Sequence, residues 1–482
     1  MFPPPCPAPA GPCWSRRHAL CGLIALPLPL PLPLWPLAQA QVNPPASALA
    51  LPALAWLSQR LDNGLQVLSL PQRGSSSVAV QVWYRVGSRD DPPGRSGFAH
   101  LFEHLMFKGT RHMADETFDR LTEDVGGRNN AYTAEDMTVF QNEVPAHHLE
   151  RLLWAEAERM AHLRVDQASL DSERQVVIEE MRERVLSDPY GRLFNALPQY
   201  GFSLPAYRRP VIGLQQDLEA ATLGDVQRFH ARHYRPDNAL LLVAGDFDAV
   251  QLRQWVARWF GPLRAPARPA EFEPAVAPAR DGSDRTAPQR INLTAPQVPL
   301  PALALIWPAP PADHDDAPAL ELAIALLSLG DASRLSEALV YREQIAQSVG
   351  CWTELLARQG MLVAHAVAVG GRGRPGAQSA LRQIEAALLR QVRQLRQGPV
   401  SAAELARVRT QLLTAALLSR QTAHGMAQAA GRAALLLGGA DRADAYLARL
   451  QAVDAAQVQR VLQRYMTGPP AVSLYYQQQA SA

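Results

Sequence analysis

The chain has 482 residues, of which 48% are hydrophobic and 19% charged, and its formal net charge is +2. A chain of this length exceeds what one hydrophobic core usually spans, so two or more domains are expected. The balanced charge fits a globular protein and provides no basic field for nucleic acid, so no nucleic-acid partner is expected.

The N-terminus has the features of an export signal. Arg16-Arg17-His18 supplies positive charge, residues 19–37 are apolar, and Ala38-Gln39-Ala40 is the small-x-small pattern that signal peptidases cut. We expect a signal peptide over residues 1–40 and a mature chain that begins near Gln41 and is periplasmic or otherwise exported, by either the Sec or the twin-arginine route. The alternative is a membrane anchor, but the apolar run is short and its Leu-Pro alternation disfavours a continuous helix. No stable membrane span is therefore expected after cleavage.

Cysteine usage limits how the mature protein can be stabilised. Cys6, Cys13 and Cys21 lie in the expected signal peptide, so the mature chain would keep only Cys351. An internal disulfide and a multi-cysteine structural zinc site are then excluded, and stability must come from burial of the core.

Hydrophobic periodicity predicts both strands and helices before residue 262. The second expected strand is the clearest, because Val78, Val80, Val82, Tyr84 and Val86 alternate onto one face. The expected elements are strands over 64–70 and 77–87, helices over 97–108 and 117–125, a strand over 137–144, helices over 148–163 and 170–186, and a strand over 238–247.

A stretch dense in Pro, Ala and Arg divides the chain into two parts of comparable length. We expect a first domain over 41–262, a linker over 263–290 and a second domain over 291–482. The segments 218–228 and 450–460 share apolar positions and a terminal Val-Gln-Arg, which favours a duplication. Strands and helices do not alternate strictly, so the fold class predicted for each domain is α+β, with helices on a mostly antiparallel sheet.

The segment His100-Leu101-Phe102-Glu103-His104 matches the inverted zinc-peptidase motif H-x-x-E-H. On a helix, residues four apart lie on one face, so the imidazoles of His100 and His104 can reach the same ion. Glu103 lies close enough to meet water beside that ion without ligating it, which suits a general base. The alternative is an amphipathic helix with two polar histidines and no catalytic role.

A catalytic zinc ion usually has three protein ligands and one open position, so a third ligand is needed. The best source is the acidic helix that contains Glu173, Glu179 and Glu180. Glu173 and Glu180 are two turns apart and share a face, whereas Glu179 points about 100° away. Spacing alone favours Glu180 over Glu179 or Glu183 only weakly, and a solvated acidic face remains the alternative.

Three segments, GFAHLFEHLMFKGT, GGRNNAYTAEDMTVF and ERQVVIEEM, resemble the pitrilysin, insulinase and mitochondrial-processing-peptidase family of inverted zincins. They follow the order and spacing of that family, and the resemblance covers essentially the whole mature chain. It implies one Zn²⁺ per chain, held by His100, His104 and Glu180. It further implies Glu103 as the catalytic base and Glu173 as a catalytic residue that supports the site.

The same resemblance implies a fold and a mode of substrate binding. Two related α+β domains would face each other as half-shells, the first catalytic and the second non-catalytic. Asn130 and Ala131 would lie on an edge strand that pairs with the substrate backbone, a contact that tolerates many sequences. Without the resemblance, residues 126–130 would be interpreted only as a turn before a strand.

These features predict a zinc-dependent endopeptidase that cleaves peptides or unfolded segments outside the cytosol. The main alternative is a non-catalytic assembly or binding protein that retains the peptidase fold. A catalytic subunit dedicated to one peptide substrate also stays open.

The second half lacks the zinc motif, and residues 317–329, which contain no histidine, are expected to form a packed core helix. Many members of the family carry an arginine and a tyrosine, seven residues apart, in a segment that begins Ser-Arg-Leu. Alignment on Ser333-Arg334-Leu335 places Val340 and Gln347 at those positions. The missing pair predicts a non-catalytic homologous subunit that supplies the arginine and tyrosine. The alternative is that Arg342 substitutes and that the chain acts alone or as a homodimer.

Overall fold

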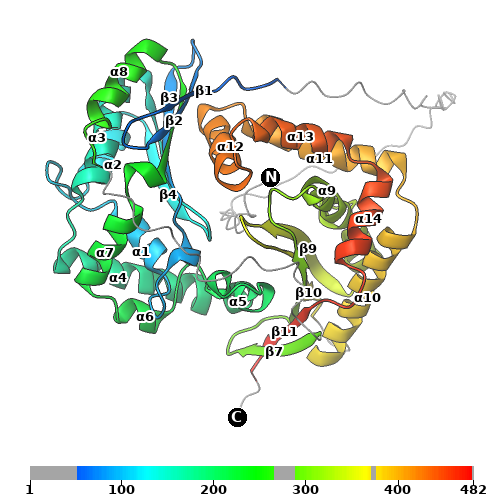
Figure 1. Ribbon diagram of the computed structural model, residues 1–482. Helices are drawn as coiled ribbons and strands as arrows, with labels where there is room; N and C mark the ends of the chain where they lie inside the picture. Colours follow the sequence, from blue (N-terminus) through cyan, green and yellow to red (C-terminus); the bar gives the residue numbers. More distant parts are fainter. Residues whose placement is uncertain (1–51, 265–287, 371–375, 480–482) are drawn as a thin grey trace, which may run out of the picture. The chain divides into compact units, whose positions relative to one another are not determined.

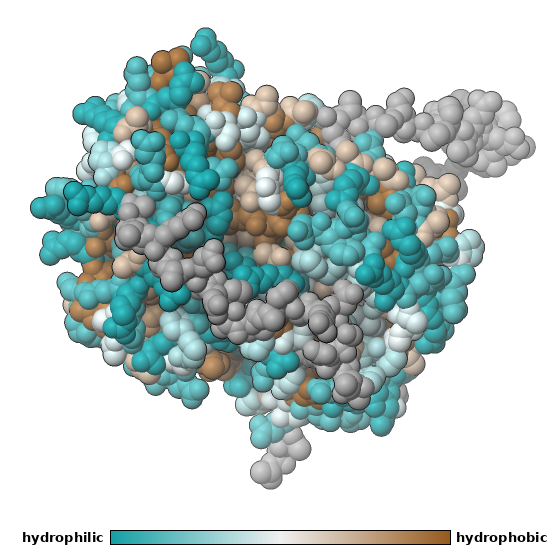
Figure 2. Space-filling model, viewed as in Figure 1, coloured by the Kyte–Doolittle hydropathy of each residue, from teal (hydrophilic) through white to brown (hydrophobic). Residues whose placement is uncertain are grey.

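The computed structural model describes residues 52–264, 288–370 and 376–479 (Figure 1). The expected signal peptide, residues 1–40, and most of the expected linker, residues 263–290, lie outside the described residues, so the domain boundaries remain a prediction. None of the described helices is both long and apolar enough to cross a bilayer. On the face shown in Figure 2, hydrophobic residues are visible in several separate places among hydrophilic ones.

Two sheets form the framework of the chain. The first has six strands in the order β1-β2-β6-β3-β5-β4, and the second has five in the order β7-β11-β8-β10-β9. Neighbouring strands are antiparallel except for one parallel pair in each sheet, β2 with β6 and β7 with β11. The strands are β1 (Leu57–Arg60), β2 (Gln66–Pro71), β3 (Ser77–Tyr84), β4 (Arg128–Thr133), β5 (Thr138–Pro145), β6 (Ala239–Gly245), β7 (Gln289–Ala295), β8 (Ala302–Ala309), β9 (Ala346–Leu355), β10 (Gly360–Ala368) and β11 (Val472–Gln478).

The two sheets share one strand order. If β1 is set aside, each sheet places its first strand beside its fifth, followed by the second, the fourth and the third. The segments 218–228 and 450–460, whose sequences are alike, both precede the returning fifth strand, β6 or β11. The common order supports the predicted duplication and confirms the α+β fold class.

Helices follow the strands in both halves. Most predicted elements before residue 262 are found within a few residues of their expected bounds, but the helix expected over 170–186 leaves α-geometry at Arg182 and continues as a π-helical turn, Arg182–Ser187. The helices are α1 (Phe98–Leu105), α2 (Thr117–Glu123), α3 (Leu149–His162), α4 (Gln167–Met181), α5 (Gly191–Gly201), α6 (Gln215–Glu219), α7 (Leu223–His233), α8 (Ala249–Trp259), α9 (Ala317–Ser328), α10 (Ala377–Gln397), α11 (Ala402–Ser419), α12 (Ala423–Leu436), α13 (Arg442–Ala452) and α14 (Ala455–Tyr465).

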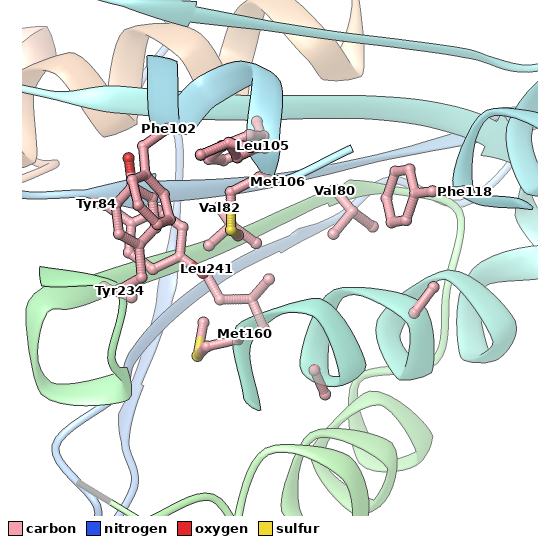
Figure 3. Close-up of a cluster of buried hydrophobic side chains, with 14 of the residues drawn as sticks. Val80, Val82, Tyr84, Phe102, Leu105, Met106, Phe118, Met160, Tyr234 and Leu241 are labelled. Atoms are coloured by element: carbon pink, nitrogen blue, oxygen red, sulfur yellow. The ribbon is translucent and has the colours of Figure 1, made fainter. Parts of the chain in front are cut away.

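Strand β3 is buried on both faces. The residues predicted to alternate onto one face, such as Val80 and Val82, pack with side chains of α1 in a hydrophobic cluster (Figure 3). The opposite face is covered by α12, where the Gln81 amide Nε2 donates to the His424 carbonyl oxygen at 3.1 Å. A Cβ at Gly431 would lie 2.3 Å from the Trp83 ring, so this helix approaches the sheet closely because it carries glycine there.

Each half contributes a helix that packs against the sheet of the other half. Leu193 and Leu197 of α5, which comes from the first half, belong to a hydrophobic cluster with Ile306 and Val363 of the second sheet. Each sheet is thus completed by a helix that lies on the other side of the expected linker in sequence. Periodicity within one half cannot reveal such packing.

Candidate active site

The helix that carries the H-x-x-E-H motif begins at a well-defined cap. The Asp91 carboxylate accepts hydrogen bonds from the backbone N–H groups of Gly97, at 2.7 Å, and Ala99, at 2.9 Å. Gly97 has a left-handed φ of 98°, and a Cβ there would lie 2.9 Å from the Gly213 Cα. A negative side chain at a helix N-terminus is stabilising, so these residues fix where α1 starts.

Helix α1 separates an apolar face from a polar one. Phe102, Leu105 and Met106 point into the cluster drawn in Figure 3, and the Phe102 ring stacks on Tyr234 with centroids 4.7 Å apart. His100 and His104 lie on the polar side, with ring centroids 4.9 Å apart. Packing of the apolar face therefore orients both imidazoles toward α4.

Helix α4 brings Glu180 to the two histidines. Its N-terminus is capped by Asp166, which accepts from the backbone N–H of Ser169 at 2.8 Å, and the helix packs beside α1 (Figure 1). Glu180 Oε2 lies 3.3 Å from His104 Nε2 and 3.7 Å from His100 Nε2. In the described part of the chain, this trio is the group of three side chains suited to hold a metal ion, with ligand atoms within 4.8 Å of one another.

The spacing of these atoms fits zinc. Tetrahedral coordination at about 2.0–2.2 Å places neighbouring ligand atoms roughly 3.3–3.6 Å apart. The two distances to Glu180 Oε2 lie close to that range, 3.3 Å within it and 3.7 Å just beyond it. Two imidazole nitrogens and one carboxylate oxygen also make up the donor set of many catalytic zinc sites, which leave a fourth position open.

Glu173 lies behind His104, as the shared helix face predicted. Its Oε2 is 3.5 Å from His104 Nδ1, and its Oε1 is 2.6 Å from Lys108 Nζ. Carboxylates at the far nitrogen of a histidine orient the ring and favour the tautomer that ligates through the other nitrogen. His100 differs, because its Nδ1 is buried and no hydrogen bond reaches it within the described residues.

The pKa values of the two histidines move in opposite directions. Burial lowers the pKa of His100 to about 4. Burial alone would also lower the pKa of His104, but hydrogen bonds with Glu173 and Glu180 raise it to about 9. A metal ion requires both rings to be neutral, so its binding near neutral pH displaces a proton from His104.

Glu103 projects from the same helix and is held by the neighbouring sheet. Burial raises the pKa of its carboxyl group, and a hydrogen bond from Thr133 acts in the opposite direction. The Thr133 hydroxyl donates to Glu103 Oε2 at 2.7 Å. A raised pKa suits a carboxylate that must accept a proton near neutral pH.

Three side chains that contact the predicted site were not expected from the sequence, namely Thr133, Lys108 and Arg184. Arg184 lies in the π-helical turn after α4, with Nη1 2.5 Å from Glu180 Oε1. Lys108 and Arg184 could have been found from spacing, because each follows a predicted ligand by one helical turn, Lys108 after His104 and Arg184 after Glu180. Thr133 depends on a contact between a strand and a helix.

The predicted substrate-binding residues lie on β4, an edge strand that pairs only with β5 in the first sheet. This position confirms the expected edge strand. Residues 126–130 are therefore more than a turn, because β4 begins at Arg128. The Asn130 side-chain oxygen accepts from the Ala131 backbone N–H at 2.8 Å. Pairing of Asn130 and Ala131 with a substrate backbone remains a prediction.

In the second half, the residues aligned with the arginine and tyrosine of the family fall on separate elements. Val340 lies in the π-helical turn Ser336–Arg342, and Gln347 lies exposed near the start of β9. Arg334 is engaged elsewhere, with Nε 2.7 Å from Glu404 Oε1. The packed core helix expected over residues 317–329 is found as α9, Ala317–Ser328.

Two family models match consecutive parts of the chain. The model described as insulinase, peptidase family M16, matches residues 66–214, and the one described as the peptidase M16 inactive domain matches residues 220–412. All residues of the candidate site lie in the first of these ranges.

Individual relatives agree with the family models. A zinc protease named PqqE from Helicobacter pylori is 31% identical over 349 residues, which cover 72% of this chain and 76% of that protein. A probable mitochondrial-processing peptidase subunit beta from Arabidopsis thaliana is 25% identical over 84% of this chain and 75% of its own length. The crystal structure of a protease from Helicobacter pylori has a TM-score of 0.79 at 26% identity, covering 88% of this chain and 99% of that one. The chain therefore belongs to the insulinase family of peptidases, family M16.

Proposed function

We propose that the protein is an active zinc-dependent endopeptidase that cleaves peptides or unfolded segments. The observation that carries the proposal is the convergence of His100, His104 and Glu180 at zinc-ligand spacing, with Glu103 on the same helix. All four lie in the part of the chain that matches the peptidase model, and not in the part that matches the inactive domain.

The chain supplies most of what hydrolysis requires. A zinc ion held at this site would contribute Lewis-acid chemistry, by acidifying water and polarising the scissile carbonyl. Glu103 takes the proton of the attacking water and returns it to the leaving amine. Strand β4 holds an extended substrate by backbone pairing at Asn130 and Ala131, so extended conformation selects substrates more than any one side chain does.

Metal analysis and peptide hydrolysis together test this proposal. The mature protein should contain about one zinc per chain, and it should cleave a quenched peptide in a reaction that a chelator stops and added zinc restores. Bound zinc without hydrolysis, in the presence of any co-purifying subunit, would favour the non-catalytic binding protein instead. Hydrolysis that is insensitive to the chelator would point to a different active site.

We also propose that a second subunit completes the substrate-binding surface. Val340 and Gln347 stand where many members of the family carry the arginine and tyrosine, and one relative is itself named as a subunit of a processing peptidase. A donor missing from a buried acceptor would weaken transition-state binding by a few kcal/mol. Activity of the isolated chain should then be weak and rise when a homologous subunit that carries the pair is added. Full activity of a monomer or homodimer, with no gain on addition, would exclude the divided site.

Export is proposed from the N-terminal sequence alone. The charged start, the apolar run and Ala38-Gln39-Ala40 support cleavage before Gln41 and a location outside the cytosol. N-terminal sequencing of the protein from its native compartment tests this, and recovery of Met1 from the cytosolic fraction would contradict it.

A further inference from the structure

We propose that Thr133 is a positioning residue, whose hydroxyl fixes the carboxylate of Glu103 in the orientation needed for proton transfer. The proposal rests on the proposed function, because it assigns a role in the same reaction. The observation is the 2.7 Å hydrogen bond from Thr133 Oγ1 to Glu103 Oε2, made between the last residue of β4 and the middle of α1.

The hydroxyl has one proton and two acceptors within reach. Glu103 Oε2 lies at 2.7 Å, whereas the Ala99 carbonyl oxygen lies at 3.5 Å, so the carboxylate is the effective acceptor. In the described part of the chain, no other hydrogen bond to the Glu103 carboxylate is found. Thr133 therefore occupies Oε2 and leaves Oε1 to receive the proton from water.

The threonine can position Glu103 because its own backbone is fixed. Thr133 pairs in register with Thr138 of β5, and the turn that follows is closed by a 2.8 Å hydrogen bond from the Ala134 N–H to the Met137 carbonyl oxygen. A Cβ at Gly87 would lie 2.2 Å from the Ala134 carbonyl oxygen, so the glycine allows the neighbouring chain to pack directly against this turn. The backbone N–H of Ser88 then donates to the same oxygen at 3.1 Å.

The position of Thr133 also connects the base to the predicted substrate strand. Asn130 and Ala131 precede Thr133 on β4, so a peptide that pairs with the strand would be held in register with the carboxylate that activates water. A glutamate has three rotatable bonds, and a single misplaced rotamer moves its oxygens by more than an ångström. One hydrogen bond from a fixed strand removes that freedom.

Three variants test the assignment, each purified with zinc and with any subunit that co-purifies. Thr133→Val keeps the shape but removes the donor, Thr133→Ser keeps the donor, and Thr138→Val removes a buried hydroxyl from the residue opposite in register. Thr138 Oγ1 donates to the Val86 carbonyl oxygen at 2.9 Å rather than to Glu103, which makes it the matched control.

We expect kcat of Thr133→Val to fall about ten- to a hundred-fold, with KM changed by less than about three-fold, because only the orientation of the base is lost. Zinc content and the melting temperature of the metal-free protein should stay close to those of the wild type. Thr133→Ser should recover most of kcat, and Thr138→Val should keep it. If Thr133→Val does not fold, Thr133→Ala provides the same comparison against serine.

Three results would overturn the positioning role: an unchanged kcat in Thr133→Val, a loss of zinc in that variant, or an equal loss of kcat in Thr138→Val. Failure of the proposed function gives a different pattern. In that case the zinc-loaded wild type itself would not cleave peptides, and the variants would have no activity to lose.

Discussion

The two halves have the same strand order but differ in the chemistry of one helix, the one that follows β3 in the first half and β8 in the second. In the first half that helix is α1, whose polar side carries two histidines and Glu103 and faces the carboxylates of α4. In the second half it is α9, whose buried residues include Leu320, Leu322 and Leu326 and whose neighbours include β9, α11, α13 and α14. A shared topology therefore determines where a helix lies, and the elements that surround it determine whether it can hold a metal ion.

Removal of the base should have the largest effect, because it makes the first half as inert as the second. Glu103→Gln is expected to keep zinc and to lose at least about 10²–10⁴-fold in kcat, since the amide cannot accept the proton. Turnover of a quenched peptide, measured together with zinc content, checks this. A variant with near-normal turnover would remove Glu103 from the mechanism.

The third ligand can be separated from its neighbour in sequence. Glu180 is 16% exposed and faces both histidines, whereas Glu179 is 63% exposed and forms an ion pair with Arg182. Glu180→Gln should therefore lose most of its zinc, and Glu179→Gln should retain it, as measured by metal analysis after dialysis. Equal losses of zinc in the two variants would mean that Glu180 is not the ligand that α4 contributes.

Sequence patterns were enough to predict the elements that contain local signals. The period-two alternation of β3 and the i, i+4 spacing of His100 and His104 depend only on neighbours along the chain. In the structure the alternating residues of β3 share one hydrophobic cluster, and the two histidines lie side by side on α1. Spacing on α4 could not separate Glu180 strongly from Glu179 or Glu183, because that choice depends on where α1 lies. The choice of Glu180 as the third ligand came instead from the resemblance to the peptidase family.

Two features had no signal in the sequence. The burial of Gln81 and Trp83 by α12 joins residues about 340 positions apart, and polar Gln81 in a strand pattern would ordinarily indicate a solvent-facing side. The Thr133 hydrogen bond joins a strand to a helix through the register of the sheet. Periodicity describes one element at a time and cannot predict which elements meet.

A core truncation in α9 tests whether the second half contributes to stability without supporting the metal site. Leu326 is fully buried, so Leu326→Ala is expected to lower the free energy of unfolding by about 2–5 kcal/mol through lost burial and a residual cavity. Chemical denaturation measures this loss. Zinc content at a temperature where the variant is folded should stay normal, because α9 contributes no ligand. Loss of zinc from the folded variant would show that the second half supports the metal site.

The smallest expected effect concerns a group of charges where the two halves meet. Asp136, which follows β4, accepts a hydrogen bond from the backbone N–H of Ala357 in the second half at 2.7 Å. Its neighbour Glu135 has a raised pKa, first because of burial and next because of the negative charge of Glu354 on β9; the charge of Arg432 on α12 acts in the opposite direction. Burial likewise raises the pKa of Glu354.

These shifts give the pH dependence of stability a definite sign. An acid whose pKa is higher in the folded than in the unfolded state binds more protons when folded, so its contribution to stability is greatest at low pH and is lost as pH rises through the folded value. Glu135→Gln mimics the protonated form and cannot charge. The melting temperature of the metal-free wild type should therefore fall more between pH 5 and pH 9 than that of Glu135→Gln, by about 2–4 °C. Use of metal-free protein removes the protons linked to zinc binding. Parallel curves would show that Glu135 carries the same charge in both states, and that the acidic contact between the halves does not respond to pH.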